Sequence, residues 1–189
     1  LLDTSADSAW NGSTTYATQA IAWYADVGGS PSSMTVAVDS IQSTDVNQHF
    51  YSAVAFDVTG FDSGSPFAQA SVDNGASLGG GNSESGTLTL GGSPTNGNLV
   101  VAMFGVGADN GGGSSTPSGY TALVNQNQGY TQVAVFYRTD TTTAAVTCSD
   151  LGQAVGSWGG VIFEMTLAGG GGGTPVAVFS YHYKQQGIQ

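Results

Sequence analysis

Residues 131–138 read Thr-Gln-Val-Ala-Val-Phe-Tyr-Arg, a run in which apolar side chains recur at every second position. Val133, Val135 and Tyr137 would lie on one face of an extended chain and the residues between them on the other, because successive side chains of a β-strand point to opposite faces. This pattern predicts a β-strand.

The same alternation recurs elsewhere in the chain. Residues 99–104 divide into two interleaved apolar sets, and in residues 161–167 Val161, Phe163, Met165 and Leu167 alternate with Ile162, Glu164 and Thr166. The polar, glycine-rich cluster at residues 109–119 has the composition of turns and loops. No long stretch shows the i, i+3, i+4 apolar spacing of an amphipathic helix. The sequence therefore predicts an all-β protein.

The strand at residues 131–138 also belongs to an internal repeat. Three segments of the first third of the chain match later ones in the same order: 18–24 with 131–137, 35–38 with 145–148, and 51–59 with 158–166. The offset between partners shrinks from each match to the next, as expected if the second copy has shorter loops. Ordered matches of this kind indicate a duplicated structural unit.

The repeat predicts two tandem β-sandwich modules. We expect a first copy at residues 1–66, a second at residues 67–168, and a glycine hinge with a C-terminal segment at residues 169–189. The first copy lacks counterparts of two strands that precede Tyr120 in the second copy, at 87–90 and 98–107. Because open sheet edges are normally covered or completed, we expect either further N-terminal residues or strands from another chain.

Several short motifs of the second copy resemble one module family. They are residues 97–101 (Gly-Asn-Leu-Val-Val), 117–121 (Pro-Ser-Gly-Tyr-Thr), 136–137 (Phe-Tyr), 145–147 (Ala-Val-Thr) and 161–164 (Val-Ile-Phe-Glu). The pattern resembles an immunoglobulin-like or jelly-roll-like β-sandwich module common in phage structural proteins and large bacterial surface proteins, and it covers about residues 10–168. The resemblance implies a fold, and a role as spacer, decoration or binder; it implies no catalytic residue.

Charge excludes two classes of partner. The chain has 13 acidic and two basic residues, Arg138 and Lys184, for a formal net charge of −11. Nucleic-acid binding depends on Lys and Arg neutralising phosphates, so we expect no nucleic-acid partner. Docking on anionic membranes is disfavoured for the same reason, and no apolar run is long enough to insert into a bilayer.

The chain carries few groups suited to catalysis. His49 and His182 lie outside any metal-binding spacing, and the nucleophile-elbow motif is absent. Cys148, the single cysteine, aligns with Val38 and is predicted to be a buried, inert thiol. We expect no enzymatic activity, no cofactor and no metal.

The acidic residues offer one alternative. Asp57 and Glu164 align at the last strand of each copy, and we expect outward-facing carboxylates there, with a cation site as the alternative. Calcium at Asp57, Asp62 and Asp73 is a weaker alternative, because these residues lack the spacing of a calcium-binding loop.

The aromatic residues have two interpretations. Trp10, Trp23 and Trp158 could form a sugar-binding platform, but Trp23 aligns with Phe136 and Trp158 with an aromatic of the first copy, which favours core packing. Trp10 and Tyr120 lie at loop ends and are the candidate ligand contacts.

The C-terminal segment carries the candidate assembly site. Five glycines at residues 169–173 predict a flexible hinge, and a strand-like, aromatic-rich segment follows at 174–184. The predicted contact residues are Val176, Val178, Phe179, Tyr181 and Tyr183. A lone strand is unstable, so we expect it to pair with a sheet edge, on a neighbouring subunit, the alternative being a disordered tail.

These features predict a non-enzymatic virion structural protein, a phage capsid-decoration, tail or fibre component that assembles through strand pairing. The first alternative is a secreted bacterial surface, filament or adhesin protein, and the second a carbohydrate-binding module. The expected location is the virion surface or the extracellular space. The expected partners are further copies of the chain or other virion proteins, with a cell-surface glycan as a further candidate.

Overall fold

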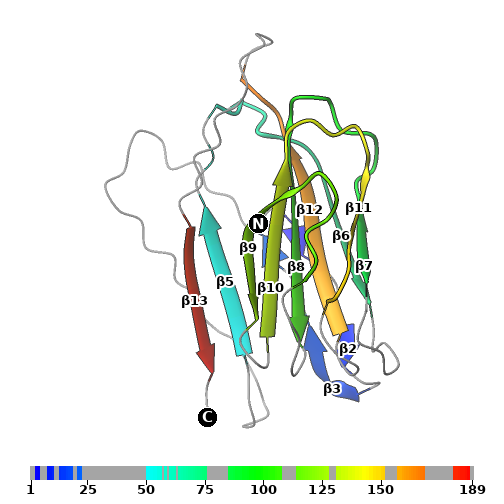
Figure 1. The fold of residues 1–189 in the computed structure, drawn as a ribbon, viewed down its shortest axis with the longest axis vertical. Helices are drawn as coiled ribbons and strands as arrows, with labels where there is room; N and C mark the ends of the chain where they lie inside the picture. The colour runs from blue at the N-terminus through cyan, green and yellow to red at the C-terminus, as the bar shows by residue number, and fades with distance from the viewer. Residues whose placement is uncertain are drawn as a thin grey trace.

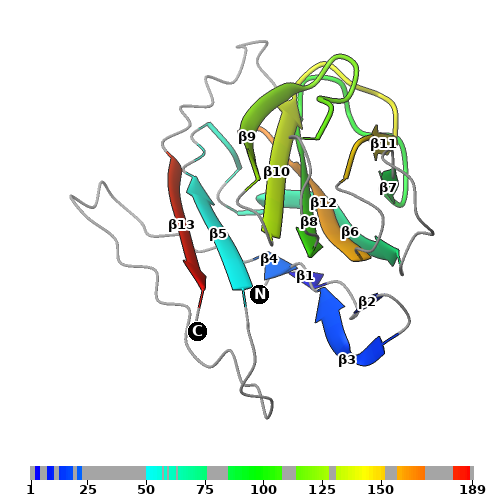
Figure 2. The same cartoon turned by 60° about the horizontal axis from the view of Figure 1, so that its bottom comes forward.

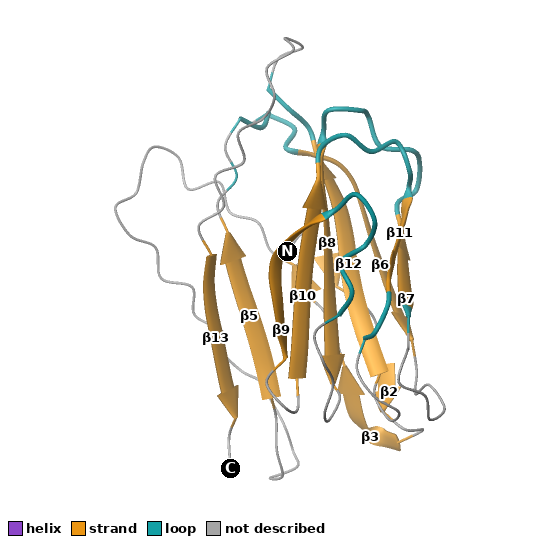
Figure 3. Cartoon of the chain, in the orientation of Figure 1, coloured by secondary structure: helices purple, strands orange, loops and turns teal. Residues whose placement is uncertain are grey.

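The computed structural model describes residues 3–4, 8–10, 13–18, 21–22, 50–56, 58, 60–62, 64–75, 85–107, 114–127, 131–151, 157–168 and 181–187. All regular secondary structure in these residues is β-strand, with no helix, and every strand pair is antiparallel (Figure 3). The predicted all-β class is confirmed.

The largest sheet has five strands in the order β6-β12-β8-β10-β9 (Figure 1). Its strands are β6 (Phe67–Gly75), β8 (Leu99–Gly107), β9 (Thr121–Asn127), β10 (Thr131–Arg138) and β12 (Ser157–Met165). A second sheet pairs β7 (Gly86–Thr89) with β11 (Ala145–Cys148). The two strands predicted at 87–90 and 98–107 correspond to β7 and β8, whereas β6 was not anticipated.

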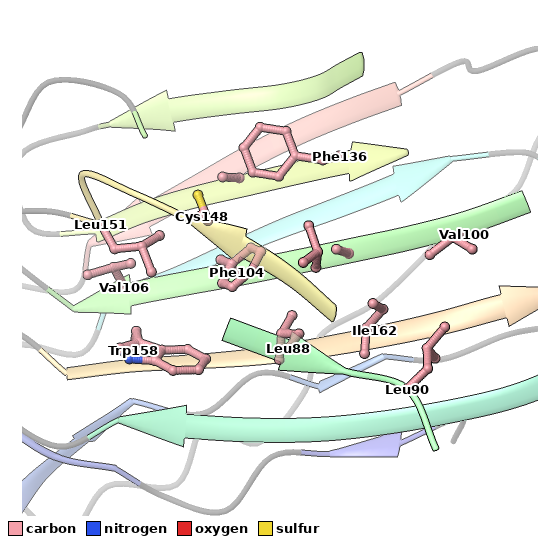
Figure 4. Close-up of a cluster of buried hydrophobic side chains, with 13 residues drawn as sticks. Leu88, Leu90, Val100, Phe104, Val106, Phe136, Cys148, Leu151, Trp158 and Ile162 are labelled. Carbon is pink, nitrogen blue, oxygen red and sulfur yellow. The ribbon is translucent and has the colours of Figure 1, made fainter. Parts of the chain in front are cut away.

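The β7–β11 pair covers one face of the five-stranded sheet and encloses the first hydrophobic cluster (Figures 2 and 4). Phe104 of β8 lies between Phe136 of β10 and Trp158 of β12, with ring centroids 6.3 and 5.9 Å away. Leu88 of β7 is fully buried against them. Each fully buried side chain of this size contributes about 1.5–3 kcal/mol, so this core fixes the two layers together.

The opposite face of the five-stranded sheet is buried as well. Its cluster includes Leu99, Val101, Val133, Val135, Val161, Phe163 and Met165. Val54 of β5 (Phe50–Phe56) packs against this cluster, as do Val58 and Phe61 from the segment that follows. The division of alternate residues between two faces, predicted for all three runs, is therefore confirmed: odd-numbered positions face the second cluster and even-numbered positions the first.

Trp158 occupies a space that two glycines leave open. A Cβ placed on Gly75 would lie 2.2 Å from the indole Nε1, and one on Gly86 would lie 2.8 Å from its Cε2. Gly160, two residues further along β12, is equally restricted, since its Cβ would meet the Met103 carbonyl oxygen at 2.8 Å. The small residues at these positions therefore let the indole and the second sheet approach the backbone closely.

A short segment after β5 is held against the end of β12. Phe61 and Leu167 form an isolated antiparallel bridge, and the Asp62 N–H donates to the Thr166 carbonyl at 2.9 Å. The Thr166 N–H in turn donates to the Pro66 carbonyl at 2.9 Å. These bonds join the chain that leads into β6 to the chain that leaves β12.

The described strands before residue 57 form only two-stranded pairings. β1 (Asp3–Thr4) pairs with β4 (Ile21–Ala22), β2 (Ser8–Trp10) with β3 (Ser13–Thr18), and β5 with β13 (Tyr181–Gly187). One sandwich-like unit, built from strands between residues 67 and 165, is thus present. A second complete sandwich is not confirmed.

Candidate functional site

The pairing of β13 with β5 joins two segments that lie far apart in the sequence (Figure 1). Seven consecutive residue pairs make up the ladder, from Tyr181 opposite Phe56 to Gly187 opposite Phe50. All seven strands of the sandwich-like unit lie between these two segments in the chain. The C-terminal strand therefore returns past that unit to pair with β5, a strand that precedes the unit in the sequence.

The structure contains two of the five predicted assembly residues. Tyr181 stands opposite Phe56, and Tyr183 stands opposite Val54, whose side chain packs on the second cluster of the sheet. The other three, Val176, Val178 and Phe179, lie outside the described residues, as do the glycines at 169–173. The strand begins later than the predicted segment and extends to Gly187. Its edge partner is β5 of the same chain, and pairing on a neighbouring subunit stays a prediction.

The two candidate ligand contacts lie in different surroundings. Trp10 ends β2 and stands opposite Ser13 of β3, next to a register shift. The Tyr120 ring is half-buried against the first cluster, and its hydroxyl has no hydrogen-bond partner among the described residues. Burial raises the pKa of Tyr120, and the charge of Arg138 opposes that rise. A ligand at either residue stays a prediction.

Tyr120 is held by the turn that precedes it. Its N–H donates to the Pro117 carbonyl at 3.0 Å, and Gly119 has a φ of 78°, a conformation that glycine adopts without strain. The guanidinium of Arg138 covers this glycine, since a Cβ there would lie 2.2 Å from Nη1. The predicted turn at 117–121 thus exists, and the glycine in it is required for close approach.

Arg138 is engaged locally. Its Nε donates to Asp140 Oδ1 at 2.6 Å, and its Nη1 lies 3.5 Å from the Ser118 carbonyl oxygen. The bond from Arg138 lowers the pKa of Asp140. One of the chain's two basic side chains is therefore already paired, which leaves little positive charge for an anionic ligand.

Glu164 contradicts the prediction of an outward-facing carboxylate. It is 1% exposed and lies on the side of β12 that faces the first cluster, near the strand's end. Gln69 Nε2 donates to Oε2 at 2.6 Å, while the Thr95 N–H and Asn98 Nδ2 donate to Oε1 at 2.8 and 2.6 Å. Three neutral donors satisfy the buried carboxylate, which is why it is tolerated there.

The cation interpretation of the acidic residues finds no geometric support in the described chain. Asp57, the partner of Glu164 in the repeat, lies outside it. Asp62 Oδ1 accepts the Gly64 N–H at 2.9 Å in a turn, and Asp73 Oδ1 accepts the Asn74 N–H at 2.7 Å within β6, so both carboxylates bond to nearby backbone. Within the described residues, no three His, Cys, Asp or Glu side chains gather closely enough to hold a metal ion.

Cys148 is buried, as predicted. The thiol is fully excluded from solvent in the first cluster and donates to the Ser115 carbonyl at 3.6 Å. Burial raises the pKa of the Cys148 thiol to about 11, so it stays protonated at neutral pH. A protonated, enclosed sulfur is a poor nucleophile, which is consistent with a packing role.

A small polar network closes the same end of the sandwich. The side chain of Asn125 makes two hydrogen bonds to the backbone of Ser114: Oδ1 accepts the N–H at 3.1 Å and Nδ2 donates to the carbonyl at 2.5 Å. Gln132 Nε2 donates to the Ser114 hydroxyl, and Ser115 Oγ donates to Asp150. Sequence reasoning did not identify this network, whose members come from four separate segments.

The remaining candidates are the two histidines and the tryptophans. His49 lies outside the described residues, and His182 stands in β13 opposite Ala55. Trp158 is a core residue, 6% exposed, as its alignment predicted, while the side chains of Trp10 and Trp23 are not described. No helix in the described part of the chain is long and apolar enough to span a membrane.

Comparisons with protein-family models, curated proteins and solved structures find no match to this chain. The resemblance to phage and bacterial surface modules therefore remains a prediction.

Proposed function

We propose that this chain is a non-enzymatic structural protein that assembles through β-strand pairing, as a capsid-decoration, tail or fibre component of a bacteriophage virion. The observation that supports the proposal best is the β13–β5 ladder. In this ladder a segment late in the sequence adds as a strand to the edge of β5, and strand-addition complexes form through the same kind of pairing.

The rest of the fold suits a structural role. The five-stranded sheet is buried on both faces, and the described turns are held by backbone and carboxylate hydrogen bonds. Such a unit can project from a particle without rearranging. We further propose that the strands before residue 66 form the first of two tandem sandwiches. In this first sandwich, β5 would occupy the position that β12 occupies in the second.

A secreted bacterial filament or surface protein is the second candidate, because it would use the same strand pairing. Negative-stain images of the native assembly, with the chain located by antibody labelling, separate the two. Label on phage particles supports the first candidate, and label on cell-surface fibres supports the second.

The strand-pairing function is tested with proline substitutions in β13. Tyr183→Pro and Lys184→Pro each remove one backbone N–H, and consecutive N–H groups of a strand point to opposite edges. One of the two variants must therefore lose a bond to β5. Tyr183→Ala and Lys184→Ala are the matched controls, since they keep every backbone donor.

We expect at least one proline variant to lose incorporation into particles or filaments. Both alanine variants should be incorporated at a higher level than that proline variant. Circular dichroism and tryptophan fluorescence should report an unchanged sandwich, because Trp158 and its neighbours lie in a separate cluster. Wild-type incorporation of both proline variants would contradict assembly through this strand.

A further inference from the structure

The internal repeat lets the neighbours of β5 be compared with those of its counterpart β12. In the second copy β12 is a central strand, paired with β6 on one edge and β8 on the other. Among the described residues β5 pairs with β13 alone. β13 therefore takes the position beside β5 that β6 or β8, two strands of the same sheet, takes beside β12.

The registers support this equivalence. The repeat aligns Val54 with Val161. Val161 has Met103 of β8 and Val72 of β6 opposite it, and Val54 has Tyr183 opposite it, all in antiparallel ladders. Val54 also packs against the cluster that contains Val161, so β5 lies on the second face of the five-stranded sheet as well as beside β13. β13 thus gives β5 an antiparallel neighbour, as β6 and β8 do for β12, and its sequence Tyr-His-Tyr-Lys-Gln-Gln-Gly is more polar than theirs.

We propose that β13 is a donor strand exchanged between copies of this chain, so that Tyr181–Gly187 of one copy pairs with Phe50–Phe56 of the next. This inference rests on the proposed function and names its partner: a second copy of the same chain. The ladder between copies is the same seven-pair ladder seen within one chain.

Exchange is favoured by how the strand is connected. β13 follows the sandwich-like unit in sequence but pairs with a strand that precedes that unit. The intervening sequence includes five consecutive glycines at 169–173, the residue type that least restricts the backbone. Because exchange replaces a contact with an identical one, its cost is low and chain concentration decides the balance.

The stoichiometry of donor and acceptor defines the product. Each copy carries one donor strand, β13, and one acceptor strand, β5. Reciprocal exchange closes a symmetric dimer, and serial exchange from copy to copy builds an open, head-to-tail array. Both products place β13 and β5 of different copies side by side.

Disulfide trapping between full-length chains tests the proposal. Ala53 stands opposite Lys184 and Ser52 opposite Gln185, two consecutive pairs of the ladder. Directly opposite positions in an antiparallel ladder have Cβ atoms close to the separation that a disulfide needs, and one of two consecutive pairs is of the closer type. The cysteines are introduced in a Cys148→Ala background so that no other thiol competes.

Chains carrying only Ala53→Cys are mixed with chains carrying only Lys184→Cys, unfolded, refolded together and oxidised; Ser52→Cys with Gln185→Cys is treated likewise. Exchange predicts a disulfide-linked species at twice the chain mass for at least one pair. The off-register control, Ala53→Cys with Gln186→Cys, should give several-fold less.

The double variants Ala53→Cys/Lys184→Cys and Ser52→Cys/Gln185→Cys measure the same pairing within one chain. If either closes within the chain while neither mixture cross-links, the strand is fixed in its own chain and exchange is refuted, although assembly by another surface would survive. If neither the mixtures nor the double variants cross-link, the ladder itself is wrong and the proposal falls. Loss of the cross-link on dilution before oxidation is expected, since exchange depends on concentration.

Discussion

Replacement of Glu164 by Gln tests whether the buried carboxylate stabilises the fold. The change keeps the size of the side chain and one oxygen but turns the other oxygen into a donor. In the structure Oε1 accepts from Thr95 and Asn98, and Oε2 accepts from Gln69. A glutamine that keeps the two bonds of Oε1 must direct its NH2 group at Gln69 Nε2, so two donors would face each other.

Gln69 cannot relieve this conflict without loss. Its Oε1 accepts the Gly92 N–H at 2.9 Å, and its Nε2 also donates to the Gly92 carbonyl at 3.2 Å. Rotating the amide by half a turn would oppose like groups at both contacts. A hydrogen bond to a charged group contributes about 1.5–3 kcal/mol, and burying a neutral amide costs less than burying a carboxylate, so the two effects partly offset. We expect Glu164→Gln to lower the free energy of unfolding by about 1–3 kcal/mol.

The assay is urea unfolding at pH 7, followed by circular dichroism and tryptophan fluorescence, with the slope m compared between variants. Asp73→Asn is the matched control: this exposed carboxylate lies on β6 of the same sheet, and its loss should change stability by less than about 0.5 kcal/mol. A Gln69→Ala/Glu164→Gln double-mutant cycle should give a coupling energy of about 0.5–3 kcal/mol. If Glu164→Gln matches Asp73→Asn within error, the three-donor account is refuted.

Three further outcomes are expected. Native Cys148 should react slowly with a thiol reagent at pH 8 and rapidly once the chain is unfolded in urea; equal rates would contradict its burial. Burial raises the pKa of Cys148 from its ordinary value of 9.0 to about 11 in the folded chain. The protonated thiol should therefore contribute fully to the free energy of unfolding below pH 9.0, and this contribution should be lost as pH rises through about 11. Cys148→Ala should flatten that alkaline decline in thermal unfolding. Gly160→Ala should lower the free energy of unfolding by about 1–3 kcal/mol, because the added methyl group would overpack against Met103 and Leu88. Gly105→Ala is the control: its Cβ would meet only a carbonyl oxygen at 3.8 Å, so it should be tolerated in the same urea denaturation assay.

The strands of the five-stranded sheet were predictable where both faces of the sheet are buried. Runs such as 99–104 and 131–138 carry apolar residues at consecutive positions because each face contacts its own cluster. β6 escaped prediction because Phe67–Gly75 is rich in Ala, Ser, Asp and Asn, residues with weak or no strand preference. It becomes a strand through its ladder with β12, a partner far away in sequence.

The environment of Glu164 could not be read from its own segment. Acidic residues are rarely buried, so the residue type alone favours exposure. Its three donors come from positions 69, 95 and 98, which only the folded sheet brings together. The tail was predictable as a strand from its aromatic alternation, but its partner was not, because backbone pairing with β5 leaves no signature in either sequence.

The sequence of β5 explains why its edge needs a strand beside it. Edge strands are normally protected from unwanted pairing by charged side chains, by proline or by bulges. Phe50–Phe56 reads Phe-Tyr-Ser-Ala-Val-Ala-Phe and contains neither a charged residue nor a proline. β13 supplies what β5 lacks, since it brings Lys184, half of the chain's basic residues, opposite Ala53. β5 is thus an apolar strand without protective residues, and a strand from the far end of the chain pairs with one of its edges. The lack of protective residues that would make β5 prone to indiscriminate pairing is also what the exchange proposed above requires of an acceptor strand.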